Sequence, residues 1–188
     1  MRQWIGKSCA GKRFLNLYCY TAVASIHAAV GGATYSVSVD LSQKYLEWAA
    51  ANYQLNEVNR QQHELVHADC HRWLTEYTES RSSSRANSAS RDHGADFDLI
   101  FLDPPTFSNS TSMEGDWDVQ RDHLSMIDRC MAILKPGGTL VFSNNFRKFK
   151  LSQQVTDNYR VENRTRWSLQ RDFSRNPRIH QCWFILHP

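Results

Sequence analysis

Apolar runs alternate with amphipathic stretches along this chain. An apolar run at 13–18 is followed by an alanine-rich stretch at 21–30, which ends at two glycines. A second run at 35–39 precedes a stretch at 42–55, where Ser42 can cap a helix and apolar residues recur at helical spacing. This order predicts strand, helix, strand and helix, the start of a βαβ arrangement.

The same pattern continues along the chain. A weaker strand is predicted at 63–67, and Asp69 can cap the helix after it. The strongest apolar run, at 97–102, is typical of a central parallel strand. An amphipathic helix is predicted at 120–134, and Lys-Pro-Gly-Gly should end it before a strand at 139–143.

The last part of the chain should close the sheet. Loose alternation at 160–167 and a strongly apolar stretch at 180–186 predict an antiparallel pair at one edge. Strands that alternate with helices indicate an α/β fold with a mostly parallel, doubly wound sheet. We expect one domain over 1–188, with a mobile surface insertion at 79–94, where almost no side chain is apolar.

Composition narrows the functional class. No apolar run reaches the roughly 18 residues of a membrane helix, and the first residues lack the plan of a signal peptide. We therefore expect a cytoplasmic protein without a membrane partner. The five cysteines are widely spaced and form no metal-binding motif, so reduced thiols and no metal site are expected.

Charge is distributed unevenly. Within 145–180, nine basic residues against three acidic ones give +6, whereas the whole chain carries +3. The remainder is therefore slightly acidic. A basic C-terminal third predicts a surface that meets phosphates.

Polar residues come directly after the predicted strands. These positions are the carboxyl ends of the strands, where ligands bind in such sheets. Asp40 lies about 20 residues beyond the first turn, from which a carboxylate can accept hydrogen bonds from ribose hydroxyls. No G-x-G-x-x-G run or phosphate loop follows the first strand, which disfavours NAD and ATP. A nucleoside without phosphates, such as that of S-adenosylmethionine, is favoured. The candidate cofactor residues at these strand ends are Asn16, Tyr18, Thr21, Asp40, Leu41, Asp69, Cys70 and Asp103.

The strand at 97–102 ends in an acidic turn. Asp103, Pro104 and Pro105 combine a carboxylate with two residues that fix φ and lack a backbone N–H. Phe107 follows as an aromatic side chain that could stack on a flipped-out base. We expect Asp103, Pro104, Pro105 and Phe107 to form the catalytic region.

These segments together resemble the class I S-adenosylmethionine-dependent RNA methyltransferases. The resemblance is strongest to the C-terminal module of the bacterial bifunctional 23S rRNA guanine methyltransferases (RlmK/L type), and it covers nearly the whole chain. The segments that carry it are Phe14 to Thr21, Val39 to Ser42, Tyr45 to Ala49, Ala68 to Cys70, Asp103 to Asn109 and Phe142 to Asn145.

The resemblance implies a Rossmann-like, seven-stranded fold and a set of roles. The turn after Asn16 would hold the methionine part of the cofactor, Asp40 the ribose, and Asp69 with Cys70 the adenine. The segment 103–107 would be the meeting point of methyl donor and base. Many relatives carry further N-terminal domains, so the chain resembles a piece of a longer protein.

The resemblance also implies methylation of guanine at N7. N7 attacks with a lone pair that bears no proton, so positioning dominates and no general base is required. A C5-pyrimidine mechanism needs a cysteine after the strand at 139–143, and none stands there. Methylation of an exocyclic amine, guanine N2 or adenine N6, stays open, as does an RNA-binding module without activity.

Overall fold

The computed structural model describes residues 1–86, 96–109, 115–169 and 179–188. The helices are α1 (Arg2–Ser8), α2 (Val23–Val30), α3 (Gln43–Leu55), α4 (Cys70–Ala86), α5 (Val119–Ala132), α6 (Gln153–Asn158) and α7 (Thr165–Ser168). The strands are β1 (Arg13–Leu17), β2 (Tyr35–Asp40), β3 (His63–His67), β4 (Phe97–Leu102), β5 (Phe107–Ser108), β6 (Trp117–Asp118), β7 (Leu134–Asn144), β8 (Arg160–Asn163) and β9 (Gln181–Leu186).

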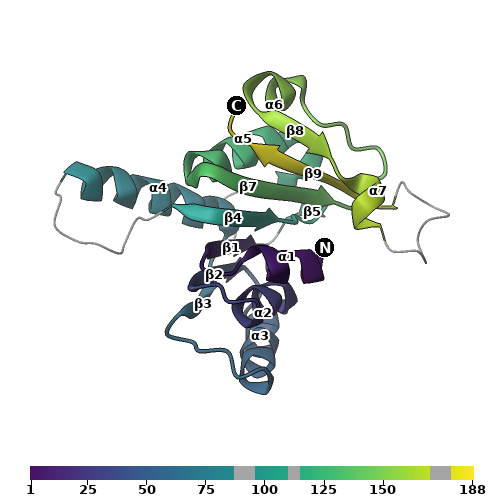
Figure 1. Cartoon of the computed structure of the whole chain (residues 1–188). Helices are drawn as coiled ribbons and strands as arrows, with labels where there is room; N and C mark the ends of the chain where they lie inside the picture. The colour runs from purple at the N-terminus through teal and green to yellow at the C-terminus, as the bar shows by residue number, and fades with distance from the viewer. Residues whose placement is uncertain (87–95, 110–114, 170–178) are drawn as a thin grey trace.

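Seven strands form one sheet in the order β3-β2-β1-β4-β7-β9-β8. The first five run parallel, β9 is antiparallel to β7, and β8 is antiparallel to β9. Figure 1 shows β4 and β7 in the middle of the molecule, with β8 and β9 beyond them. The predicted mostly parallel sheet with an antiparallel edge pair is confirmed, and β4 is its central strand.

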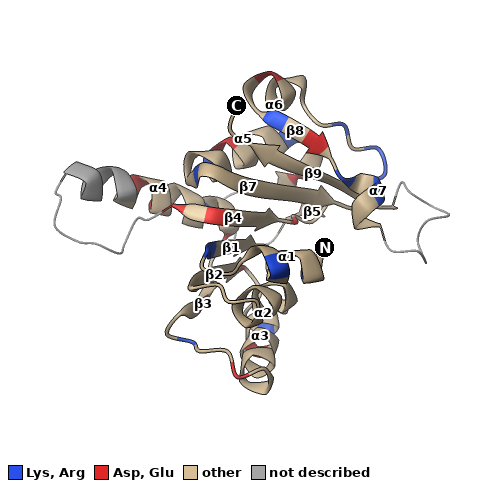
Figure 2. Cartoon of the chain, viewed as in Figure 1, with Lys and Arg blue, Asp and Glu red and all other residues tan. Residues whose placement is uncertain are grey.

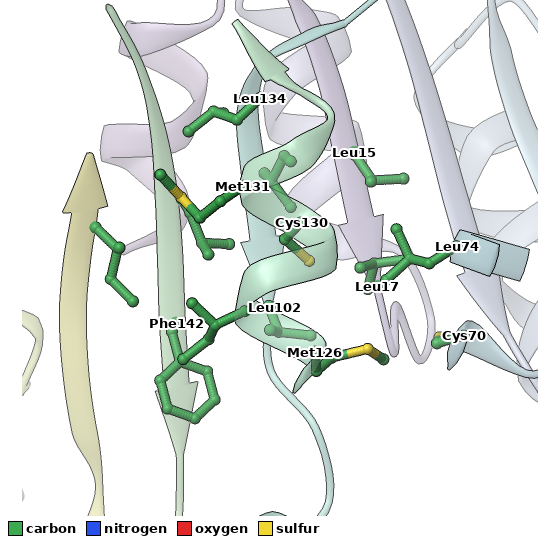
Figure 3. Close-up of a cluster of buried hydrophobic side chains, with 14 of the residues drawn as sticks. Leu15, Leu17, Cys70, Leu74, Leu102, Met126, Cys130, Met131, Leu134 and Phe142 are labelled. Atoms are coloured by element: carbon green, nitrogen blue, oxygen red, sulfur yellow. The ribbon is translucent and has the colours of Figure 1, made fainter. Parts of the chain in front are cut away.

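Helices cover both faces of the sheet, as a doubly wound fold requires. On one face α4 and α5 pack on β1, β4 and β7 through Leu74, Met126 and Cys130, among other apolar side chains. Figure 3 shows α5 lying over these strands, with Met126 extending toward Cys70 and Cys130 on the side of Leu17. On the other face, α1, α2 and α3 supply two smaller clusters.

The start of β7 differs from the prediction. The strand begins at Leu134 rather than at 139, because Leu134 already pairs with Phe97. The next paired positions are Thr139 and Leu99, so the Lys-Pro-Gly-Gly segment bulges opposite Asp98. Gly138 is required there, since a Cβ would lie 2.9 Å from the Asp98 carbonyl oxygen.

Other boundaries also need correction. α4 runs to Ala86, so residues 79–86 of the expected mobile insertion are helical, and 87–94 lie outside the described residues. The stretch 160–167 is a strand only to Asn163, and α7 follows. Helices α1 and α6 and the small β5–β6 ladder were not predicted. In the described part of the chain, no helix is long and apolar enough to cross a membrane.

Candidate cofactor and acceptor site

One cavity lies at the carboxyl ends of the parallel strands, where β1, β2, β4 and β7 end. Its volume is about 670 Å³. That volume is in the range of small-molecule sites, roughly 300–1,000 Å³. The residues that line it are Tyr18, Tyr20, Asp40, Leu41, Ser42, Tyr45, Asp69, Cys70, Asp103, Pro104, Pro105, Ser108 and Asn145.

The turn after β1 forms one wall and has an unusual backbone. Tyr18, Tyr20 and Ala22 have φ values of 57°, 53° and 54°, in the left-handed region that favours glycine. Hydrogen bonds hold the turn, because Tyr18 N–H donates to Cys70 Sγ at 3.2 Å and Cys19 N–H donates to the Val39 carbonyl at 3.0 Å. Strained backbone that the surroundings impose is common at ligand sites.

Asp40 links this turn to the next helix. Its Oδ2 accepts from Tyr20 N–H at 2.8 Å, and its Oδ1 accepts from Ser42 N–H at 2.9 Å. Ser42, not Asp40, is the N-cap of α3, and its hydroxyl accepts from Tyr45 N–H. A carboxylate has about four acceptor positions, so Asp40 keeps capacity for ligand hydroxyls on the cavity side.

Asp69 and Cys70 form the far end of the same wall. Asp69 Oδ1 accepts from Arg72 N–H at 2.9 Å, which confirms the predicted cap of α4 and leaves Oδ2 as an acceptor. The Cys70 thiol is buried, and burial raises its pKa well above the ordinary value. Cys70 is therefore an unreactive side chain that supports the turn of Tyr18.

Asp103 forms the opposite wall with the two prolines. Ser143, at the end of β7, donates its hydroxyl to Asp103 Oδ1 at 2.6 Å. Burial raises the pKa of Asp103, while the Ser143 hydrogen bond and the positive charge of Arg2 oppose the increase. The proline turn is also held by β6, because Trp117 Nε1–H donates to the Pro105 carbonyl at 2.8 Å.

The structure places most predicted site residues at this cavity. Those that line it are Tyr18, Asp40, Leu41, Asp69, Cys70, Asp103, Pro104 and Pro105. Three do not. The Asn16 side chain is buried and donates to the Ser25 hydroxyl at 2.9 Å, while Thr21 accepts from Asn52 Nδ2 through its carbonyl at 3.1 Å. Phe107 lies beside the lining residue Ser108, with 53% of its surface exposed.

Other residues of the site were missed. Tyr20 and Tyr45 line the cavity, and their ring centroids lie 4.3 Å apart. Asn145 lines the acceptor side, and Ser143 and Trp117 hold Asp103 and Pro105 in place. Ser143 and Asn145 directly follow a predicted strand, and that position was the available signal. No sequence spacing links Trp117 to the proline turn.

Comparison with a family model identifies the family of this chain and its cofactor. The family model described as S-adenosylmethionine-dependent methyltransferase matches residues 1–156. The chain belongs to this family. Its cofactor is S-adenosylmethionine, and a cavity at the strand ends with carboxylates on one wall suits a nucleoside ligand without phosphates. Among the described residues, no group of three or more His, Cys, Asp or Glu could hold a metal ion.

Curated relatives are similar to the whole chain. The chain is 52% identical over 187 residues to the ribosomal RNA large subunit methyltransferase K/L of Saccharophagus degradans, covering 100% of this chain and 23% of that protein. It is 51% identical over 185 residues to the protein of the same name from Pseudomonas aeruginosa, covering 98% and 23%. The chain therefore spans about a quarter of the length of these relatives.

Solved structures share the fold. A protein assigned as a methyltransferase and solved in complex with SAH matches with a TM-score of 0.75 and 25% identity, covering 98% of this chain and 47% of that one. A protein from Streptococcus mutans, assigned as SAM-dependent methyltransferase, matches with a TM-score of 0.70 and 26% identity, again covering 98% and 47%. The Rossmann-like class I methyltransferase fold predicted from the sequence is confirmed.

Proposed function

We propose that this chain is the methyl-transferring part of an enzyme that methylates guanine at N7 in large-subunit ribosomal RNA. The observation that carries the proposal is the cavity with two dissimilar walls. Carboxylates and a curled turn suited to a nucleoside form one wall, and an acidic proline turn beside an exposed phenylalanine forms the other. The names of the relatives support ribosomal RNA as the substrate.

The cofactor wall would hold S-adenosylmethionine through three groups. Asp40 would accept hydrogen bonds from the ribose hydroxyls, and Asp69 Oδ2 would accept from the adenine amino group. The turn from Tyr18 to Ala22 would contact the methionine part. When bound, the cofactor supplies an electrophilic methyl group on a positively charged sulfur.

The acceptor wall would orient the base. N7 of guanine needs no base to remove a proton, so the protein has to hold N7 about 3–3.5 Å from the methyl carbon and in line with it. Asp103 would accept from guanine N–H groups, and its orientation is fixed by Ser143. Phe107, the neighbour in sequence of the lining residue Ser108, has an exposed side chain and would stack on the flipped-out base.

The basic C-terminal third would bind the RNA backbone. Figure 2 shows blue residues on the connection between β7 and α6 and at α7, near the end of the sheet that carries Asp103. Arg147, Lys148, Lys150 and Arg166 make no ion pair with other described residues, so their charges are available to phosphates. Arg171, Arg175 and Arg178 lie outside the described residues. Such a substrate implies a cytoplasmic enzyme.

Methyl transfer to protein-free large-subunit rRNA from cells that lack the gene tests the proposal. We expect N7-methylguanosine in the nucleoside digest, and a transfer rate lower by about 10- to 100-fold in Asp103→Ala, since an oriented hydrogen bond to the base is lost. The exposed Asp157→Ala, on α6, is the matched control. Methyl groups on guanine N2 or adenine N6 would overturn the N7 assignment in favour of exocyclic-amine chemistry.

A further inference from the structure

Asn145 lies on the acceptor side of the cavity and carries a side-chain amide that can donate hydrogen bonds. The residue directly follows β7, is exposed, and lines the cavity together with Asp103 and Pro104. Its Oδ1 lies 3.3 Å from His180 Nδ1. Burial lowers the pKa of His180, so the imidazole is neutral near pH 7 and carries one N–H. With an amide oxygen facing Nδ1, that nitrogen is the one that holds the proton.

This contact fixes which end of the Asn145 amide remains available. Because Oδ1 accepts from His180, the Nδ2 group keeps two N–H donors for a ligand. The neighbouring groups differ in character. An ionised Asp103 can only accept, and its Oδ1 is already bound to Ser143. Pro104 and Pro105 have no backbone N–H.

The edge of guanine that carries N7 matches a donor at this position. Guanine shows two acceptors on that edge, N7 and O6, whereas adenine shows the N7 acceptor and the N6 amino donor. A base whose N7 faces the methyl group has its 6-substituent close beside the reacting atom. An amide N–H donor there satisfies guanine O6 and meets the amino group of adenine donor to donor.

We propose that Asn145 Nδ2 donates to O6 of the acceptor guanine and so selects guanine over adenine. The inference rests on the proposed N7 chemistry, and it identifies Asn145 as the residue that recognises guanine through O6. His180 would be the positioning residue, because its Nδ1–H would hold the amide oxygen and leave the Nδ2 donors for the base.

The proposed hydrogen bond is tested by removing the Asn145 donor from the protein and O6 from the base, separately and together. The full natural polypeptide that carries this sequence is assayed on an rRNA fragment whose accepting guanosine is replaced by inosine, which keeps O6 and N1–H, or by 2-aminopurine riboside, which lacks both. We expect 2-aminopurine to lower kcat/KM by roughly 10- to 100-fold relative to inosine in the unchanged protein. Asn145→Ala should lower kcat/KM on guanosine by a similar factor. Its further loss with 2-aminopurine should be smaller than that of the unchanged protein, because only the N1–H that Asp103 would accept is then still to be lost.

Three further variants sharpen the test. Asn145→Asp places an acceptor opposite O6, so its loss on guanosine should exceed that of Asn145→Ala, and its relative rate on adenosine should rise. His180→Ala frees the amide and should reduce the discrimination between inosine and 2-aminopurine while S-adenosylhomocysteine affinity stays unchanged. Asn158→Ala, an exposed asparagine at the end of α6, is the matched control and should behave as the unchanged protein.

The results separate the two claims. Independent, multiplying losses for Asn145→Ala and for 2-aminopurine would overturn the contact with O6 even if N7-methylguanosine is the product. Methylation of a fragment with 7-deazaguanosine at the accepting position would instead overturn the N7 chemistry, because that base has no nitrogen at this position.

Discussion

The two walls of the cavity are built in different ways. The cofactor wall comes from consecutive strand-to-helix turns, and its carboxylates Asp40 and Asp69 are held by backbone N–H groups within a few residues or in the turn after the neighbouring strand. The acceptor wall is held by side chains from distant segments, since Asp103 depends on Ser143 and Pro105 on Trp117. The wall for the cofactor common to the family is thus set by backbone geometry. The wall that would choose the substrate is set by pairs of side chains.

Loss of Asp40 should have the largest effect, because it damages the cofactor wall twice. Asp40→Ala removes the acceptor for Tyr20 N–H and Ser42 N–H and the proposed acceptor for ribose. Hydrogen bonds to charged groups contribute about 1.5–3 kcal/mol each, so S-adenosylhomocysteine affinity should fall by at least about 100-fold. Calorimetric titration measures this, with Asp157→Ala as control. Unchanged affinity would rule out the ribose contact.

Asp103 gives a second, smaller effect that depends on pH. The pKa of its carboxyl is raised by burial, although Ser143 and Arg2 oppose the increase, and the Cys182 thiol also faces this group. The folded chain therefore binds this proton more tightly than the unfolded chain does. The resulting stabilisation is present below the unfolded pKa of about 3.9 and is lost as pH rises through the folded pKa.

Asp103→Asn removes that dependence. From about pH 4 to pH 7, the variant should gain stability relative to the unchanged protein, and urea unfolding at several pH values measures the difference. Its methyl transfer should fall by about 10- to 100-fold at the same time. Asp157→Asn should give a curve parallel to that of the unchanged protein. Parallel curves for Asp103→Asn would mean that the carboxyl is not buried as described.

The smallest effect concerns the left-handed turn of the cofactor wall. Ala22 has a φ of 54° and caps α2 without a side-chain hydrogen bond. Ala22→Gly relieves strain of about 1 kcal/mol and loses a buried methyl group of about 0.8 kcal/mol, so the free energy of unfolding should change by less than about 1 kcal/mol. Ala28→Gly, a buried position inside α2, should destabilise by about 1 kcal/mol or more. Equal losses in urea unfolding would show that the turn is not strained.

The sequence predicted the cofactor wall better than the acceptor wall. Asp40, Asp69 and Cys70 follow predicted strands directly, so parallel topology brings them to one edge. Asn145 and Ser108 depend on how loops fold back over that edge, and Trp117 reaches Pro105 across a segment that is not fully described. Such contacts have no period or spacing in the sequence.

Some elements could not be predicted for a related reason. α1 carries few apolar residues at helical spacing, yet buried Ile5 packs it against the sheet with Phe14 and Ala28. β7 begins early because the Lys-Pro-Gly-Gly segment can bulge without leaving the strand. Tertiary packing decided both cases against local propensity.

The strand order has a consequence for how this chain folds during its synthesis. β9 lies between β7 and β8, and β8 pairs with no described strand except β9. While the polypeptide is being synthesised, β8 therefore has no neighbour until residues 181–186 have emerged, and β7 keeps an open edge. We expect the nascent chain to need protection from aggregation during this interval, and a stop codon just before β9 to leave a protein that proteases remove.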